Sequence, residues 1–144
     1  MVDKAERIAL SARRHREHII NDILTLKCPH CSMAVIDFGG CFAVEHSADR
    51  SSTRFQQGCG RHFCGWCLGP FDSSTSCHAH VKVCSRSLRP GEYYGKEGDF
   101  IKVHSASRKT RTDAYLLTIS DEEERAEAKR CISRDLQDLG ISLD

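Results

Sequence analysis

The sequence has no long apolar run and no excess of charge of either sign. No stretch approaches the roughly 20 apolar residues needed to span a bilayer, and residues 1–20 carry Arg and Glu throughout instead of the apolar core of a signal peptide. Basic and acidic residues number 21 and 20, whereas nucleic-acid-binding proteins usually show a basic excess or stripe. We therefore expect a cytoplasmic or nuclear protein with no membrane partner, and nucleic acid is disfavoured as a partner.

The sequence is also poor in aromatic residues, which make up 7% of its 144 residues, so its apolar core must be modest. In contrast, it has nine cysteines and eight histidines. In a reducing compartment clustered cysteines are more often metal ligands than disulfides, and an odd number leaves at least one thiol unpaired. We predict a small α+β domain of short strands and loops, stabilised by two zinc ions and flanked by N- and C-terminal helices.

Three segments differ in their residue pattern. Residues 1–26 lack Pro and Gly and place apolar side chains at helical spacing, which predicts a helix. Residues 27–90 hold eight of the nine cysteines, and their short apolar stretches at 34–36 and 42–44 predict brief strands. Residues 91–144 return to a helical pattern, and we expect a C-terminal helical extension there.

Helix signals within the C-terminal segment predict two helices. The first is a short helix over 113–119, with Thr112 as its cap. The second begins at Ser120, where a Glu three residues later completes a capping box, and stops at Gly140. Cys131 lies beside the apolar stripe of this second helix, and we interpret it as a packing residue.

Two Cys-x-x-Cys pairs, Cys28/Cys31 and Cys64/Cys67, are the strongest chemical signal in the sequence. This spacing lets both thiolates of a tight turn face one zinc ion while nearby backbone amides support the sulfurs. A thioredoxin-like redox motif would need a strand–motif–helix unit, which the surrounding sequence lacks. Each pair is therefore predicted to supply half of a tetrahedral zinc site.

The second pair needs two further ligands from residues 77–84. His80 and Cys84 are four residues apart, so a helical turn presents both on one face. The alternative ligand set uses Cys77 and His78, which are otherwise expected to be exposed loop residues near the metal. We favour His80 and Cys84 as the ligands.

The first pair is predicted to bind its ion together with Cys59 and with either His46 or Cys41. If His46 is the ligand, Cys41 is a free thiol that follows Gly39 and Gly40 and is sterically open to a large electrophile such as a thioester. If Cys41 is the ligand, the domain is a non-catalytic zinc-binding interaction module and His46 is an ordinary surface histidine. This choice decides the predicted function.

Several of these motifs form a set between residues 27 and 84. The set comprises Cys28-Pro29-x-Cys31, Gly39-Gly40-Cys41-x4-His46, and Cys59-x4-Cys64-x2-Cys67 with Phe63 and Trp66 each preceding a cysteine. Together they resemble the catalytic second RING domain (Rcat) of RING-between-RING ubiquitin ligases and the related in-between-RING zinc fold.

The resemblance implies a ubiquitin ligase catalytic module. Cys41 would accept ubiquitin as a thioester from a charged ubiquitin-conjugating enzyme and pass it to an amine or hydroxyl of a substrate protein. In the family, the residue at the position of His46 is a zinc ligand. The resemblance therefore supports His46 as a ligand and Cys41 as the nucleophile.

The sequence departs from the family pattern at three points. Many members carry a general-base His two residues after the catalytic Cys, where this sequence has Ala43. His62 is the substitute base that the sequence offers, unless it is simply a polar surface residue. The insertion between His46 and Cys59 is longer than usual. The first RING, which recruits the conjugating enzyme, is absent, so we expect the remainder of a larger ligase as a partner.

Overall fold

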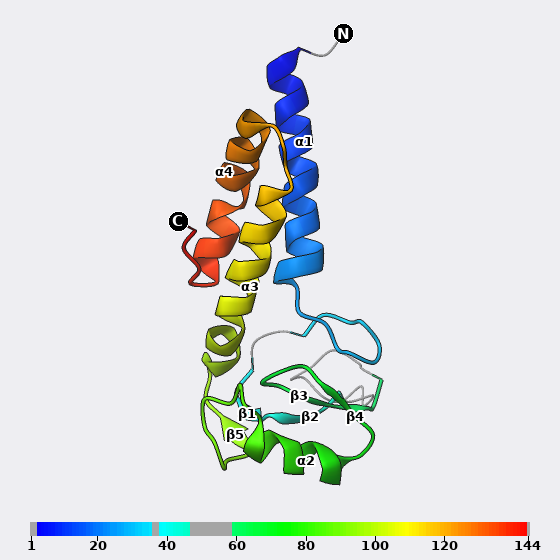
Figure 1. Ribbon diagram of the computed structural model, residues 1–144. Helices are drawn as coiled ribbons and strands as arrows, with labels where there is room; N and C mark the ends of the chain where they lie inside the picture. The colour runs from blue at the N-terminus through cyan, green and yellow to red at the C-terminus, as the bar shows by residue number, and fades with distance from the viewer. Residues whose placement is uncertain (1–2, 36–37, 47–58, 144) are drawn as a thin grey trace. The chain divides into compact units, whose positions relative to one another are not determined.

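The computed structural model describes residues 3–35, 38–46 and 59–143 (Figure 1). The chain divides into two compact units. One unit comprises Met1–Thr25 and Ser105–Asp144, and the other comprises Leu26–His104. We call them the helical unit and the cysteine unit.

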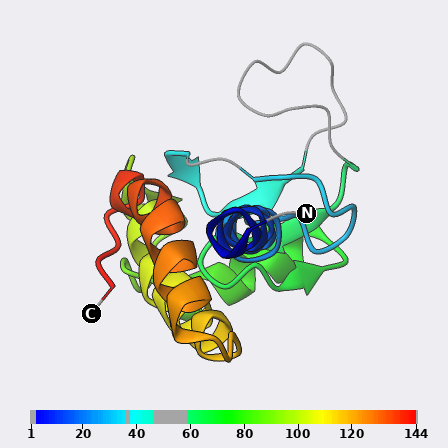
Figure 2. The same cartoon turned by 90° about the horizontal axis from the view of Figure 1, so that it is seen from above.

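The helical unit is built from α1 (Lys4–His18), the π-helical segment η1 (Ile19–Leu24), most of α3 (Asp99–Leu117) and α4 (Glu122–Asp138). Helices α1 and α4 pack against one another, and Figure 2 shows α1 along its axis. Aliphatic side chains from these elements form the core: Ala12, Ile19, Ile23, Leu24, Leu116, Ile119, Ala128, Ile132, Leu136 and Ile141. None of the helices in the described part of the chain is long and apolar enough to cross a membrane.

The predicted helices agree with the structure at both ends of the chain and disagree in the middle. Residues 1–26 are helical from Lys4 to Leu24, and Gly140 follows α4 with a φ of +71°, as expected for a helix stop. Helix α4 begins one residue later than predicted, because Asp121 caps it by accepting a hydrogen bond of 2.9 Å from the backbone N–H of Glu124.

The predicted short helix over 113–119 is wrong at its start, because α3 already begins at Asp99. Thr112 is fully buried inside this helix and caps nothing. The buried stripe of α3 includes His104 and Arg108, so a search for apolar periodicity does not find it. Each side chain contacts a backbone carbonyl oxygen: His104 Nε2 lies 3.0 Å from that of Gly65, and Arg108 donates over 2.8 Å to that of Leu24.

The cysteine unit contains two small antiparallel sheets and one helix. Strands β2 (Ala43–Glu45), β3 (His62–Cys64) and β4 (Pro70–Phe71) form one sheet in that order, and α2 (Ser74–Val83) packs against it (Figure 1). Strands β1 (Gly40–Cys41) and β5 (Tyr94–Gly95) form the other. The strand predicted near 42–44 is thus present as β2. The stretch predicted at 34–36 forms an isolated bridge between Lys27 and Ala34, and its last residue lies outside the described residues.

Four fully buried aromatic side chains form the centre of this unit: Phe42, Phe63, Trp66 and Phe100. The rings of Phe42 and Trp66 stack with their centroids 3.8 Å apart. Because β5 pairs with β1, and Phe100 belongs to the same core, residues 91–104 group with the cysteine unit. The predicted division instead ended the central domain at residue 90. The structure also groups the N- and C-terminal segments into one unit, because their apolar faces share one core.

Gly95 allows β5 to approach the aromatic core. A Cβ atom at this position would lie 2.3 Å from Cε1 of Phe42, whose ring is held against Trp66. We expect Gly95→Ala to destabilise the cysteine unit by about 1–3 kcal/mol, because the ring must shift within a closely packed core. Urea unfolding followed by the fluorescence of the single tryptophan, at constant metal concentration, measures the effect. Replacement of the exposed Glu92 by alanine is the control, and equal unfolding midpoints for both variants would contradict this prediction.

Candidate metal centres and the Cys41 site

The first Cys-x-x-Cys pair lies in a turn whose amides point at the sulfurs. The N–H of Ser32 donates to the carbonyl of Cys28 over 2.9 Å, and the N–H of Cys28 donates to the carbonyl of Met33 over the same distance. Ser32 adopts a positive φ of 64°. Backbone N–H groups of His30 and Cys31 donate to the Cys28 sulfur, and that of Met33 donates to the Cys31 sulfur. This turn is therefore preorganised to stabilise two thiolates.

The second pair repeats this turn position by position. The N–H of Leu68 donates to the carbonyl of Cys64 over 2.7 Å, the N–H of Cys64 donates to that of Gly69 over 3.0 Å, and Leu68 has a φ of 61°. Amides of Trp66 and Cys67 donate to the Cys64 sulfur, and that of Gly69 to the Cys67 sulfur. Two sequences that share only the cysteine spacing therefore form the same ligand turn.

Among the described residues, two groups of side chains can each hold a metal ion. The groups are Cys28, Cys31, His46 and Cys59, and Cys64, Cys67, His80 and Cys84. Within each group all ligand atoms lie within 4.8 Å of one another. These are the two ligand sets favoured from the sequence.

Distances between the ligand atoms fit tetrahedral coordination. In the first group, His46 Nδ1 lies 3.3 Å from Cys31 Sγ and 3.8 Å from Cys59 Sγ, which is itself 3.8 Å from Cys28 Sγ. In the second, Cys67 Sγ lies 3.5 Å from His80 Nε2. Four ligands at about 2.0–2.3 Å from one tetrahedral ion are about 3.3–3.8 Å apart. Both groups therefore have room for one such ion.

The environment lowers the pKa of three ligands and raises that of two others: burial raises the pKa of the Cys28 thiol, and the hydrogen bond to Cys67 together with burial raises that of Cys64. The hydrogen bond from the Cys64 thiol, together with the Gly69 amide, lowers the pKa of the Cys67 thiol well below its ordinary value. Burial opposes ionisation of Cys31, but hydrogen bonds led by the Met33 amide lower its pKa overall. Burial also lowers the pKa of His46, which keeps its imidazole neutral. Thiolate and neutral imidazole are the forms that bind a metal ion.

The structure places His80 and Cys84 in the second ligand group and leaves the alternative pair, Cys77 and His78, outside it. His80 lies in the last turn of α2, and Cys84 follows that helix directly. Cys77 is not the exposed loop residue expected when His80 and Cys84 are the ligands: it is fully buried in α2, and burial raises the pKa of its thiol to about 11. His78 also belongs to α2, and its side chain faces Cys41.

Cys41 lies outside both ligand groups. It is half-buried in β1, opposite Tyr94 of β5, and its sulfur donates a hydrogen bond of 3.5 Å to the carbonyl of Ala43. Cys41 Sγ also lies 3.7 Å from His78 Nε2. The described residues therefore place a thiol and an imidazole in direct contact beside the metal-ligand groups.

The imidazole of His78 is held from the side opposite Cys41. Its Nδ1 lies 2.7 Å from the carbonyl oxygen of Ser74 and 3.2 Å from the hydroxyl of the same residue. The Tyr93 ring packs against it in a T-shaped arrangement, with centroids 5.0 Å apart, and the backbone N–H of Phe42, the residue after Cys41, donates to the carbonyl of Tyr93. The sequence carries a signal for this placement of His78. His78 and His80 are two residues apart on one helix, so their side chains point in nearly opposite directions and cannot both bind one ion.

His62, the base predicted from the sequence, is placed elsewhere. It pairs with Glu45, at the end of β2 that is farther from Cys41. Three residues lie between Cys41 and Glu45, and the strand from Ala43 to Glu45 runs away from Cys41, which corresponds to a separation on the order of 10 Å. The carbonyl of His62 accepts a hydrogen bond of 2.8 Å from His30 Nε2. The structure thus brings His78, and not His62, to Cys41.

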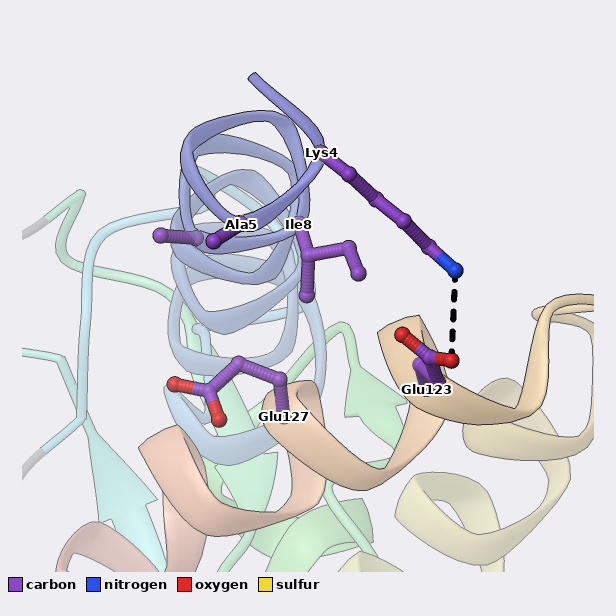
Figure 3. A pocket seen from close by; sticks show the side chains of 6 residues that line it. Lys4, Ala5, Ile8, Glu123 and Glu127 are labelled. Carbon is purple, nitrogen blue, oxygen red and sulfur yellow. Dashed lines mark hydrogen bonds and ion pairs between the residues drawn. The ribbon is translucent and has the colours of Figure 1, made fainter.

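The helical unit contains a cavity of about 560 Å³ between α1 and α4 (Figure 3). Its lining residues are Lys4, Ala5, Ile8, Ala9, Glu123 and Glu127. Lys4 and Glu123 form an ion pair of 3.2 Å in which both side chains are 64% exposed, so it adds little stability. None of these lining residues is a cysteine or histidine, so this cavity offers neither a thiolate nor an imidazole ligand.

Comparison with known proteins gives no match: no family model fits the chain, and no curated protein or solved structure is significantly similar to it. The likeness to the Rcat domain therefore rests on the motifs of this chain alone.

Proposed function

We propose that the cysteine unit is a zinc-stabilised catalytic module of a ubiquitin ligase, in which Cys41 carries ubiquitin as a thioester. One observation carries this proposal. Six of the eight cysteines in the unit belong to the two ligand groups, and Cys77 is fully buried. Cys41 is the remaining one, half-buried and in contact with an imidazole.

We propose zinc as the metal in both groups, because three thiolates and one imidazole form a donor set typical of structural zinc. Each group supplies four protein ligands and so leaves no coordination position for a substrate. When bound, the two ions would hold the short loops of the unit in place. The chemistry would then belong to Cys41 and its neighbours.

The proposed reaction has two steps. Cys41 Sγ attacks the carbonyl carbon of the thioester between ubiquitin and the conjugating enzyme, and the enzyme's own cysteine leaves as a thiolate. A substrate amine or hydroxyl then attacks the new thioester, and Cys41 leaves as a thiolate. Thioester exchange is nearly isoenergetic, so positioning of the two reactants contributes more than activation of either one.

The alternative function, a non-catalytic interaction module, required Cys41 as a metal ligand. The observed grouping leaves Cys41 out and includes His46 instead. This arrangement supports the catalytic proposal. The partners that it implies are ubiquitin, a conjugating enzyme, a substrate protein and the remainder of a larger ligase that recruits the conjugating enzyme.

A thioester assay tests the proposed function. The chain is mixed with ubiquitin-charged conjugating enzyme, with a recruiting RING domain supplied, and adducts are separated with and without reducing agent. We expect a thiol-sensitive ubiquitin adduct that disappears completely in Cys41→Ala.

The matched control is Cys131→Ala, which removes a half-buried thiol of the helical unit and should leave the adduct unchanged. Absence of any adduct on the unsubstituted chain, or an adduct that persists in Cys41→Ala, would overturn the proposal.

A further inference from the structure

We infer that His78 is the catalytic base of the Cys41 site, and that it takes the proton of the nucleophile in each transfer step. This inference rests on the proposed function. His78 of α2 is 37 residues away along the chain, and its Nε2 lies 3.7 Å from Cys41 Sγ.

The hydrogen bond at the other nitrogen defines the tautomer of His78. A carbonyl oxygen only accepts, so the contact of 2.7 Å with the Ser74 carbonyl requires a proton on Nδ1 of His78. In the neutral ring Nε2 then carries a lone pair. That lone pair faces Cys41, as a base requires. Ser74 acts as a positioning residue, because it touches the imidazole and not the sulfur.

The position of the ring is fixed by helix α2 and by Tyr93. Ser74 is the first residue of α2, and the preceding Ser73 caps the helix by accepting a hydrogen bond of 3.1 Å from the N–H of Ser76. Tyr93 packs against the imidazole in a T-shaped arrangement, and Lys82, one turn beyond His78, holds its ammonium 4.8 Å from the centre of the Tyr93 ring. The first turn of α2 and the Tyr93 ring therefore both hold the imidazole of His78, which preorganises it for proton transfer.

The proton balance of both steps follows from this arrangement. During loading, the Cys41 proton moves to Nε2 as the sulfur attacks, and the leaving thiolate of the conjugating enzyme takes a proton from the imidazolium. Once Cys41 is acylated it has no proton, and Nε2 is free to accept one from the incoming amine or hydroxyl. The departing Cys41 thiolate then recovers that proton, and His78 returns to its neutral form.

Single-turnover discharge tests the inference with the full zinc-loaded chain. Cys41 is charged with ubiquitin, further charging is stopped by removal of ATP, and loss of the thioester to free lysine is followed at one fixed pH. We expect His78→Gln, which retains a polar side chain that cannot take up a proton, to slow discharge by about 100-fold. We expect His78→Gly to be slow as well, and to be partly restored by added imidazole, which should not change the rate of the unsubstituted chain.

The controls separate catalysis from folding and from the proposed function itself. Both His78 variants should retain two zinc ions per chain, and His18→Gln in the helical unit should discharge at the normal rate. If the unsubstituted chain forms the adduct but His78→Gln discharges it normally, the assignment of His78 is overturned while the proposed function stands. The assignment is overturned in the same way if His62→Gln slows discharge in place of His78→Gln. If the unsubstituted chain forms no adduct, the proposed function fails, and the role of His78 fails with it.

Discussion

Removal of the two metal ions that we propose is expected to unfold the cysteine unit. Its strands are two or three residues long, and its core includes residues of two turns that hold four of the eight proposed ligands. Structural zinc sites in small domains supply about 10–16 kcal/mol of apparent binding energy, which exceeds the usual net stability of a domain. We expect addition of a chelator to shift the emission of the fully buried Trp66 to longer wavelength, as the indole becomes exposed to water.

The helical unit serves as the internal reference in this experiment. Its core is aliphatic and includes none of the eight proposed ligands, so we expect the helical unit to stay folded. The fractional loss of the far-UV helical signal should therefore be smaller than the fractional change of the tryptophan emission. Chelator presaturated with zinc controls for effects of the reagent itself. A Trp66 that stays buried after both ions are removed would contradict the prediction.

Replacement of His46 by alanine is expected to reduce the zinc content from two ions per chain to one. His46 is 2% exposed and belongs to the first ligand group, so its loss leaves three thiols with an incomplete coordination shell. Cys41→Ala removes a side chain that is only five residues away but lies outside that group, and it should retain two ions. Native mass spectrometry of both zinc-loaded variants measures the difference directly.

This pair of variants separates the two functions that the sequence leaves open. Zinc loss in Cys41→Ala, with zinc retained in His46→Ala, would make Cys41 a ligand and support the non-catalytic module. The reverse pattern leaves Cys41 available as a nucleophile.

The ligands of the second metal group were predictable because each depends on short-range geometry. The turn at Cys64 and Cys67 is closed by hydrogen bonds within six residues, and His80 and Cys84 are four residues apart at the end of α2. The first group needed one choice, between His46 and Cys41, that residue spacing left open. The resemblance to the Rcat pattern favoured His46, and the structure groups the same residue with the other three ligands.

Helix α3 was not predictable from apolar periodicity. Its buried face includes His104 and Arg108, which look like surface residues in the sequence. Their hydrogen-bond partners are the carbonyl oxygens of Gly65, 39 residues from His104, and of Leu24, 84 residues from Arg108. A polar side chain can be buried when such a partner exists, and the sequence of the helix does not reveal whether it does.

The spacing of the two Cys-x-x-Cys pairs was enough to predict two ligand turns, because each turn is closed by neighbouring residues, and the resemblance to the Rcat pattern then set Cys41 outside both ligand groups. The partner of that thiol was not predictable in the same way. The sequence favoured His62, whereas the pairing of β1 with β5 and the packing of α2 bring His78 to Cys41. A contact across 37 residues depends on how strands and helices meet in three dimensions, and local spacing carries no information about that meeting.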